Sequence, residues 1–343
     1  MRELTTVDEH ATSGNTGDEL TESGAALSPA VVEQVRNLIA RVVKNVGTVV
    51  RGKPEAVELC LIALLAEGHL MLEDFPGVGK TLLAKSLARS IDCRFSRIQF
   101  TPDLLPSDVT GVSIFNQKTA EFEFRGGPIF ANIVLADEIN RASPKTQSSL
   151  LECMQEHQAT IDRATYPIER PFMVIGTENP IEYEGTYPLP EAQLDRFMLR
   201  LSLGYPSHEE EMLLLAEQTG GDPLESLAPV ISANQVLGMI KAARRVVAAS
   251  PIRRYVVDLL TVTRADADLY LGASPRAGVA LLRAAKAQAL MRGRDYVVPQ
   301  DLKDLACPVL CHRVIPSPDA KLHGRTAEHI IRRLLDSVPV PIT

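Results

Sequence analysis

Apolar residues along the chain form five short runs, separated by stretches in which apolar positions recur at helical spacing. The five runs span 69–73, 95–100, 131–136, 171–176 and 198–203. Each predicts a short strand that is buried on both faces. The clearest helical segments between them lie at 80–90 and 143–156. Strands that alternate with helices in this way predict a parallel α/β sheet.

Helical patterns flank this region on both sides. Ser28-Pro29 predicts the start of a first helix, because a hydroxyl cap followed by proline is typical of a helix beginning. A second helix is predicted over 54–66, and after about Gly204 the strand signal stops. We therefore expect an α/β domain over 28–205 and an all-helical domain over 206–343.

Two segments interrupt the alternation of strands and helices. Residues 112–124 alternate between apolar and polar types around a polar centre, and 159–172 have a similar pattern. Both segments predict β-hairpins. The first falls between the second and third predicted strands, and the second comes just before the fourth.

Charge is concentrated at the amino end of the chain. The 343 residues carry 36 basic and 43 acidic side chains, a net charge of −7. Residues 1–27 hold one base and six acids, or −5, so the remainder carries only −2. The Ser-, Thr-, Gly- and acid-rich composition of 1–27 predicts a disordered tail. The nearly neutral body gives no general argument for binding nucleic acid or an anionic membrane.

Other global features favour a cytoplasmic protein without membrane insertion. No apolar run approaches the ~18 residues of a membrane span, and the acidic N-terminus lacks the apolar segment of a secretory signal. The five cysteines are scattered, as expected for reduced thiols. Cys307, Cys311 and His312 lie close in sequence, but one short cluster offers too few metal ligands, and a buried helix is the favoured interpretation.

A glycine-rich loop lies between the first predicted strand and the helix at 80–90. Its sequence, DFPGVGKT at 74–81, matches a phosphate-binding loop except that Asp74 replaces the first glycine. Gly77 and Gly79 would let backbone amides point at phosphate oxygens, and the helix would add its positive end. Lys80 is placed to reach the β and γ phosphates. The alternative, a glycine-rich turn with a chance lysine, is disfavoured by the strand–loop–helix context. The candidate nucleotide-binding residues here are Pro76, Gly77, Val78, Gly79, Lys80, Thr81 and Leu82.

Two adjacent acids follow the third predicted strand. Asp137 and Glu138 come directly after the apolar run, which places them at the carboxyl edge of a parallel sheet, where ligands bind. Asp137 would bind Mg²⁺ through its water shell, together with Thr81 of the loop. Glu138 would orient and deprotonate an attacking water. Two solvated acids at a strand end are the alternative.

These two motifs, together with three other strings of the chain, resemble the AAA+ ATPases and, more narrowly, their MoxR branch. The strings that carry the resemblance are EDFPGVGKT at 73–81, RIQFTPDLLPSD at 97–108, LADEINRA at 135–142, EAQLDRF at 191–197 and ASPRA at 273–277. The resemblance runs from about residue 28 to 335 and excludes the acidic tail. It implies a P-loop domain with five parallel strands, a small all-helical lid domain, and hydrolysis of ATP with Mg²⁺.

The resemblance also assigns roles to residues around the nucleotide. Asn179, in GTENP, would sense the γ phosphate, although an asparagine that starts a turn before Pro180 is the alternative. Gly52, in VVRG, would allow close backbone approach in the adenine pocket. Gln99 ends the second predicted strand and would couple nucleotide state to a partner.

Two arginines complete the implied catalytic set. Arg196, in LDRF, resembles an arginine finger that acts on the γ phosphate of the neighbouring subunit. Pairing of Arg196 with Glu191 or Asp195 is the alternative, and Arg141 and Arg200 are weaker finger candidates. Arg276, in SPR, resembles the lid sensor arginine, and whether it serves its own site or the neighbour's is left open.

The resemblance implies a homo-oligomeric ring, a hexamer, that remodels protein clients, often proteins with a von Willebrand A domain. Both predicted hairpins would face the pore. Their candidate contacts are Phe115, Lys118, Phe122, Phe124, Arg163 and Tyr166. Nucleic-acid remodelling and a metal-chelatase-type motor are the alternatives. Nucleic acid is disfavoured because Lys118 is accompanied by Glu121 and Glu123.

Overall fold

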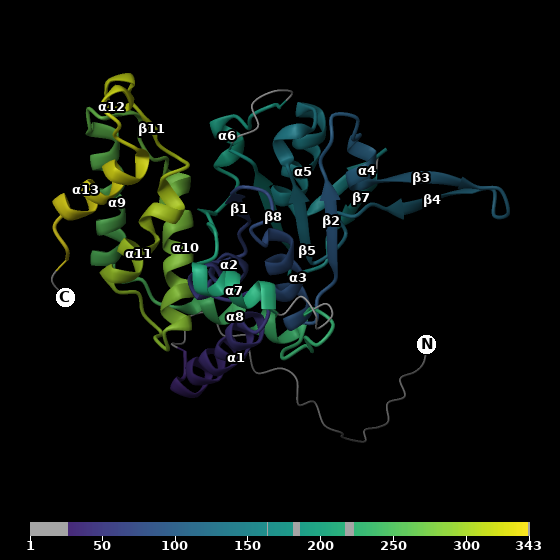
Figure 1. Cartoon of the computed structure of the whole chain (residues 1–343), viewed down its shortest axis with the longest axis horizontal. Coiled ribbons are helices and arrows are strands. Elements are labelled where there is room, and N and C mark those ends of the chain that lie inside the picture. Colours follow the sequence, from purple (N-terminus) through teal and green to yellow (C-terminus); the bar gives the residue numbers. More distant parts are fainter. Residues whose placement is uncertain (1–26, 163, 181–185, 217–222, 342–343) are drawn as a thin grey trace, which may run out of the picture.

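The computed structural model describes residues 27–162, 164–180, 186–216 and 223–341. A sheet of five parallel strands forms one part, and a group of helices forms the other (Figure 1). The strands, in the spatial order β2-β5-β8-β1-β9, are β2 (Phe95–Gln99), β5 (Ile133–Asp137), β8 (Met173–Glu178), β1 (Leu70–Glu73) and β9 (Leu199–Leu201). All five predicted strands are therefore confirmed, with ends that differ by at most two residues.

The sheet separates two hydrophobic cores, because successive side chains of a strand point to opposite faces. Ile133 and Leu135 of β5 pack into the larger core, whereas Val134 and Ala136 pack into the smaller one. The helices of this part are α1 (Pro29–Gly47), α2 (Pro54–Leu65), α3 (Lys80–Ser90), α4 (Pro106–Thr110), α5 (Pro144–Glu156) and α6 (Glu191–Leu194). Ser28 caps α1 by accepting a hydrogen bond from the amide of Val31, as its sequence predicts.

Both predicted hairpins are present. The first consists of β3 (Gly111–Asn116) and β4 (Glu121–Gly126), and it projects from the sheet domain (Figure 1). The second, β6 (Gln158–Ile161) and β7 (Ala164–Pro167), is shorter than predicted, since 168–172 lie outside its strands. The rings of Phe124 and Tyr166 stack with centroids 3.8 Å apart and join the two hairpins.

Helices dominate the C-terminal region, as expected. They are α7 (His208–Ala216), α8 (Ala233–Arg245), α9 (Ser250–Ala265), α10 (Pro275–Met291), α11 (Pro299–Leu310), α12 (Pro318–Leu322) and α13 (Ala327–Ser337). The prediction of an all-helical region missed a small antiparallel sheet, β10 (Leu269–Leu271) with β11 (Ile315–Pro316). Segments of three and two residues are too short to give an alternating pattern.

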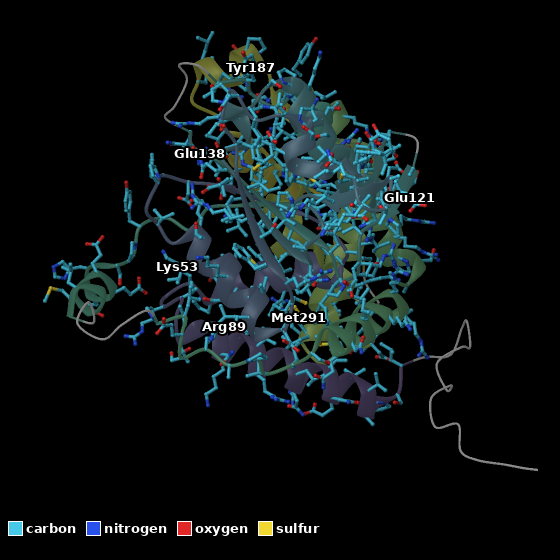
Figure 2. The ribbon with its side chains drawn as sticks, turned by 90° about the vertical axis from the view of Figure 1, so that its right-hand side faces the viewer. Lys53, Arg89, Glu121, Glu138, Tyr187 and Met291 are labelled. Carbon is cyan, nitrogen blue, oxygen red and sulfur yellow. The ribbon has the colours of Figure 1, made fainter. Side chains whose placement is uncertain are left out.

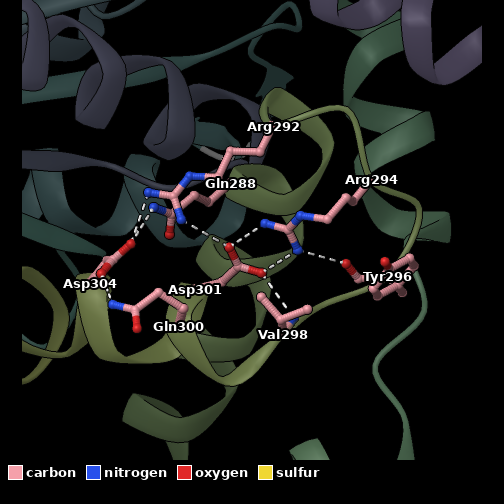
Figure 3. A network of polar contacts seen from close by, with 8 residues as sticks. All are labelled: Gln288, Arg292, Arg294, Tyr296, Val298, Gln300, Asp301 and Asp304. Carbon is pink, nitrogen blue, oxygen red and sulfur yellow. Dashed lines mark hydrogen bonds and ion pairs between the residues drawn. The ribbon is translucent and has the colours of Figure 1, made fainter.

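A buried carboxylate fixes the turn between α10 and α11 (Figure 3). Asp301 is fully buried and accepts hydrogen bonds from Arg294 at 2.6 and 2.8 Å, from Arg292 at 3.3 Å and from the amide of Val298 at 2.9 Å. These donors satisfy a charge that would otherwise be costly to bury. The helical region that follows β9, which we call the lid, is therefore held together by its own polar network as well as by its apolar core.

The lid packs on the helices that precede the sheet. α8 and α10 contact α1 and α2, and Arg283 of α10 donates hydrogen bonds to the carbonyls of Ala66 and Glu67. By contrast, α7 stands apart from the body of the protein (Figure 2). The predicted tail, residues 1–27, lies outside the described residues except for Leu27, and so does Arg163.

Candidate active site

The glycine-rich loop connects β1 to α3 at the carboxyl edge of the sheet. Gly77 and Gly79 have φ angles of +83° and +94°, the left-handed region that other residues adopt only with strain. A Cβ atom added at either glycine would meet nothing within 4 Å, so the loop borders open space. The Lys80 ammonium group donates a hydrogen bond to the Asp74 carbonyl at 2.7 Å. The loop geometry is therefore that of an anion cradle at the start of a helix.

Asp137 is the last residue of β5 and is 9% exposed. Its Oδ1 accepts a hydrogen bond from the Thr177 hydroxyl at 2.6 Å, and its Oδ2 accepts from Arg97 at 2.6 Å. Thr177 also accepts a hydrogen bond from the Glu138 amide at 2.9 Å. These contacts fix the direction of the carboxylate at the sheet edge. Sequence reasoning found Asp137 but missed Arg97 and Thr177, although Arg97 lies within one of the strings of the resemblance.

Glu138 turns the chain sharply after β5. Its φ angle of +57° is unusual for a residue other than glycine and marks strain of roughly 1–3 kcal/mol, which is common at functional sites. The Gln99 amide donates to Glu138 Oε2 at 2.7 Å, and Arg141 lies 3.3 Å from the same oxygen. Gln99, the last residue of β2, therefore meets Glu138, which directly follows β5.

These elements surround a cavity of about 400 Å³. The lining residues are Pro76, Gly77, Gly79, Lys80, Thr81, Leu82, Arg97, Asp137, Glu138 and Asn179. The structure thus brings together the predicted loop residues, the two acids and Asn179, which is 7% exposed. Val78 instead packs against the hydrophobic core. Gly52, at φ +69°, faces the carboxylate of Glu210 on α7 and does not line this cavity.

The residues of the cavity fit a magnesium nucleotide. The Thr81 hydroxyl and the Asp137 carboxylate are hard oxygen donors of the kind that Mg²⁺ prefers, and one or two protein ligands with retained waters are usual for this ion. The left-handed glycines leave room for phosphate oxygens at the loop. Within the described ranges, no group of three or more His, Cys, Asp or Glu side chains is placed to hold a metal ion.

Asp74, the residue that departs from the phosphate-loop pattern, has a structural role. Its buried carboxylate accepts hydrogen bonds from the Ser202 hydroxyl at 3.0 Å, from the Gly204 amide at 3.3 Å and from the Leu203 amide. The neighbouring Phe75 ring stacks on Tyr205 with centroids 5.6 Å apart. The start of the loop is therefore tied to the segment that leaves β9 toward the lid.

Arg196 and Arg276 lie together in a second cavity, of about 160 Å³. Gly68, His69 and Met198, which also line it, come just before β1 and β9, and the Met198 amide donates to the His69 carbonyl at 2.8 Å. This cavity is thus at the amino edge of the sheet. The phosphate loop begins at the opposite end of β1, about 13 Å away for a strand of four residues.

The contacts of Asp195 disfavour the alternative in which this residue pairs with Arg196. Asp195 forms an ion pair with Arg313 at 2.5 Å and lies 3.8 Å from Arg276. Sequence reasoning missed Arg313, a buried residue just after α11. The other finger candidates are engaged elsewhere: Arg141 lies beside Glu138, and Arg200 pairs with Glu73 at 2.5 Å.

A P-loop beside a strand-end acid pair, on a five-stranded parallel sheet followed by a helical lid, defines an ATPase of the AAA class. Comparison with known families agrees. Residues 69–199 match the ATPase family associated with various cellular activities (AAA), and 261–334 match the AAA lid domain. Among the described helices, none has both the length and the apolar character that a membrane crossing requires.

Individual relatives narrow the assignment. The chain is 42% identical to the chaperone MoxR1 of Mycobacterium tuberculosis, over 88% of this chain and 82% of that protein. It is 51% identical to the uncharacterized protein YeaC of Bacillus subtilis, over 91% and 98%. A crystal structure described as a candidate ATPase of Cytophaga hutchinsonii superposes with a TM-score of 0.86 at 41% identity, over 91% and 98%. The chain belongs to the MoxR family of AAA+ ATPases.

Proposed function

We propose that this protein hydrolyses ATP with Mg²⁺ in a hexameric ring and uses the energy to remodel or activate client proteins. One observation carries the proposal: the two groups of predicted catalytic residues lie at opposite edges of the sheet. Lys80, Asp137 and Glu138 line one cavity, whereas Arg196 and Arg276 line another. Such an arrangement forms a complete site when the second cavity of one subunit meets the first cavity of the next.

Within the first cavity, the residues divide the work of holding the nucleotide. The loop amides at Gly77 and Gly79 and the ammonium group of Lys80 bind phosphate oxygens. Thr81 and Asp137 hold Mg²⁺, which supplies positive charge to the phosphates when bound. Because Arg97 and Thr177 fix both carboxylate oxygens of Asp137, contact with the ion through its water shell is the geometry that we expect.

Glu138 is the proposed general base. Its side chain faces the cavity because the left-handed turn redirects the chain directly after Asp137. Gln99 holds one carboxylate oxygen at 2.7 Å, which sets the direction of the other. Asn179, at the end of the neighbouring strand β8, orients the attacking water together with Glu138.

Arg196 is the proposed finger, and Arg276 the proposed lid sensor, both acting on the neighbouring subunit's nucleotide. Arg276 lies beside Asp195, on the side of the sheet away from its own phosphate loop. The sequence leaves open whether Arg276 serves its own site or the neighbour's, and this placement supports the neighbour's. A guanidinium group is permanently charged and planar, so it stabilises the negative charge that develops during phosphoryl transfer.

The projecting hairpin is the proposed client contact. At its sides, Phe115 and Phe122 are 50% and 74% exposed, with their rings 5.3 Å apart. Phe124 and Tyr166, two other candidates, are instead engaged in packing between the hairpins. Exposed aromatic side chains beside Glu121 and Glu123 suit a polypeptide better than a phosphate backbone. The von Willebrand A domain clients and the cytoplasmic location, where the five free cysteines would stay reduced, remain predictions of the sequence.

The test of the shared site uses mixed rings. Glu138→Gln and Arg196→Ala variants should each bind ATP, and each should lose hydrolysis by about 10³-fold or more. Mixed in equal amounts, they should recover about a quarter of wild-type activity, since one interface in four pairs an intact site with an intact finger in a random ring. A mixture of Glu138→Gln with Lys80→Ala is the control. It should stay inactive, because both defects lie in the same half of the site. Absence of rescue in the first mixture would refute the trans assignment.

A further inference from the structure

The finger segment, residues 195–198, receives several of its polar contacts from the lid. Arg313 lies three residues after the end of α11, and its side chain is 2% exposed. It donates hydrogen bonds to the carboxylate of Asp195 at 2.5 Å and to the main-chain carbonyls of residues 195, 197 and 198 at 3.1, 2.7 and 3.0 Å. One lid side chain therefore binds four acceptors of the segment that carries Arg196.

A second lid residue supports the same segment. His312 is buried, and its Nε2 lies 3.0 Å from the Phe197 carbonyl. Because a carbonyl only accepts, Nε2 carries the proton in this contact. Burial lowers the pKa of His312 well below its ordinary value, so the ring stays neutral and acts as a hydrogen-bond donor.

Asp195 links both arginines of the second cavity to this anchor. It precedes Arg196 in the chain, pairs with Arg313, and lies 3.8 Å from the Arg276 guanidinium. Residues 195–198 lie between α6 and β9, and their amides bond the carbonyls of residues 191, 193, 194 and 69. The lid instead supplies the partners of three carbonyls of the segment and of the Asp195 carboxylate. A movement of the lid would therefore act on the acceptors of this segment, on the side opposite to its amides.

We propose that Arg313, assisted by His312, is a positioning residue that holds segment 195–198 on the lid, so that Arg196 and Arg276 reach the neighbouring subunit as one unit. The inference rests on the proposed trans action of these two arginines. Its consequence is directional coupling: a lid movement in one subunit displaces the finger that it offers and changes hydrolysis at the neighbour's site. Arg313 acts through this segment, because its own side chain is 2% exposed.

The variant that tests this is Arg313→Gln, which removes the charge and most of the donors. A displacement of the finger by about 1 Å costs on the order of 10²-fold in rate, and we expect a loss of this size with unchanged ATP affinity. An equal mixture with Glu138→Gln should restore about a quarter of wild-type activity. In the active interfaces, the Arg313→Gln subunit supplies an intact nucleotide site and the Glu138→Gln subunit supplies Arg196 in its native position. A residue that only stabilises the fold would not show rescue in trans.

Arg294→Gln is the matched control. It disrupts another arginine–aspartate pair of the same lid, between the half-buried Arg294 and the buried Asp301. The hydrogen bonds of these two side chains go to residues within 292–301 (Figure 3). It should lower the melting temperature and leave ATP hydrolysis near the wild-type rate at 25 °C. If Arg313→Gln does not fold, Asp195→Asn replaces it. That variant removes the ion pair but keeps the carbonyl contacts, and we expect a smaller rate loss, of about tenfold, that is rescued in the same way.

The outcomes separate the two proposals. If Arg196→Ala is rescued by Glu138→Gln but Arg313→Gln and Asp195→Asn are not, the positioning role is wrong while the shared site stands. Full activity of both Arg313→Gln and Asp195→Asn would also overturn the positioning role. If Arg196→Ala itself is not rescued, the proposed shared site fails, and the role of Arg313 fails with it.

Discussion

Replacing Asp74 by glycine restores the general phosphate-loop pattern and should nevertheless damage this protein. By the pattern alone, Asp74→Gly would be neutral or favourable for nucleotide binding. In the structure, the carboxylate accepts hydrogen bonds from the Ser202 hydroxyl and from the amides of Leu203 and Gly204. The backbone at position 74 is not in the left-handed region, so nothing there requires glycine.

The expected cost depends on the burial of each donor. Leu203 is 5% exposed, so its amide would be left unsatisfied in the variant, at a cost of about 1–3 kcal/mol. Ser202 is exposed, so its hydroxyl can bond water in the variant, and the loss of its bond to Asp74 adds little to the cost in stability. Greater freedom of the unfolded chain at a glycine adds about 0.5–1 kcal/mol. The variant should therefore lose about 2–4 kcal/mol of stability.

Calorimetry without nucleotide measures this loss, which corresponds to a melting temperature lower by about 4–12 °C. The Lys80 ammonium group donates a hydrogen bond to the Asp74 carbonyl, so a looser loop should also weaken ATP binding. Each 1.4 kcal/mol of binding free energy that is lost in this way lowers the ATP affinity by about tenfold. Asp103→Gly, at an exposed turn, is the control: it carries the same glycine cost and should lose no more than about 1 kcal/mol. Wild-type melting and ATP affinity in Asp74→Gly would refute the anchoring role.

Two further predictions concern the client and the pH. The Glu138→Gln variant loaded with ATP should retain client proteins in native extract. Adding Phe122→Ser should release them without changing ATP binding, and enrichment of nucleic acid instead of protein would favour nucleic-acid remodelling. Acidification should destabilise the fold, because burial lowers the pKa of His69 to about 4 against 6.5 for the unfolded chain. The contribution of His69 to the free energy of unfolding is fully present above pH 6.5 and is lost as the pH falls toward 4. His69 alone should therefore lower the free energy of unfolding by about 2 kcal/mol between pH 7 and pH 5. Denaturant titration at the two pH values measures it, and equal stability at both would contradict the assignment of a neutral buried ring.

Local patterns in the sequence were sufficient to predict the strands and helices and most of the residues that line the first cavity. The apolar runs predict all five strands of the sheet, and α3 has the predicted bounds. Burial on both faces, however, holds for β1, β5 and β8 alone among them, because β2 and β9 are edge strands with exposed residues. Lys80, Thr81 and the pair Asp137-Glu138 were found because each motif is complete within a few residues and lies at a strand end. A parallel sheet then gathers strand ends at one edge, whatever the order of its strands.

Tertiary structure alone decided how these pieces meet. The strand order places β2 beside β5, and so Arg97 on Asp137, which no spacing in the sequence indicates. The partners of Asp74 lie 128 to 130 residues away, and Arg313 lies 118 residues from Asp195. Such contacts depend on the path of the chain between lid and sheet, which periodicity does not encode. The sequence thus predicted most of the residues that line the first cavity, whereas the packing of the lid determined where Arg196 and Arg276 lie and what holds them.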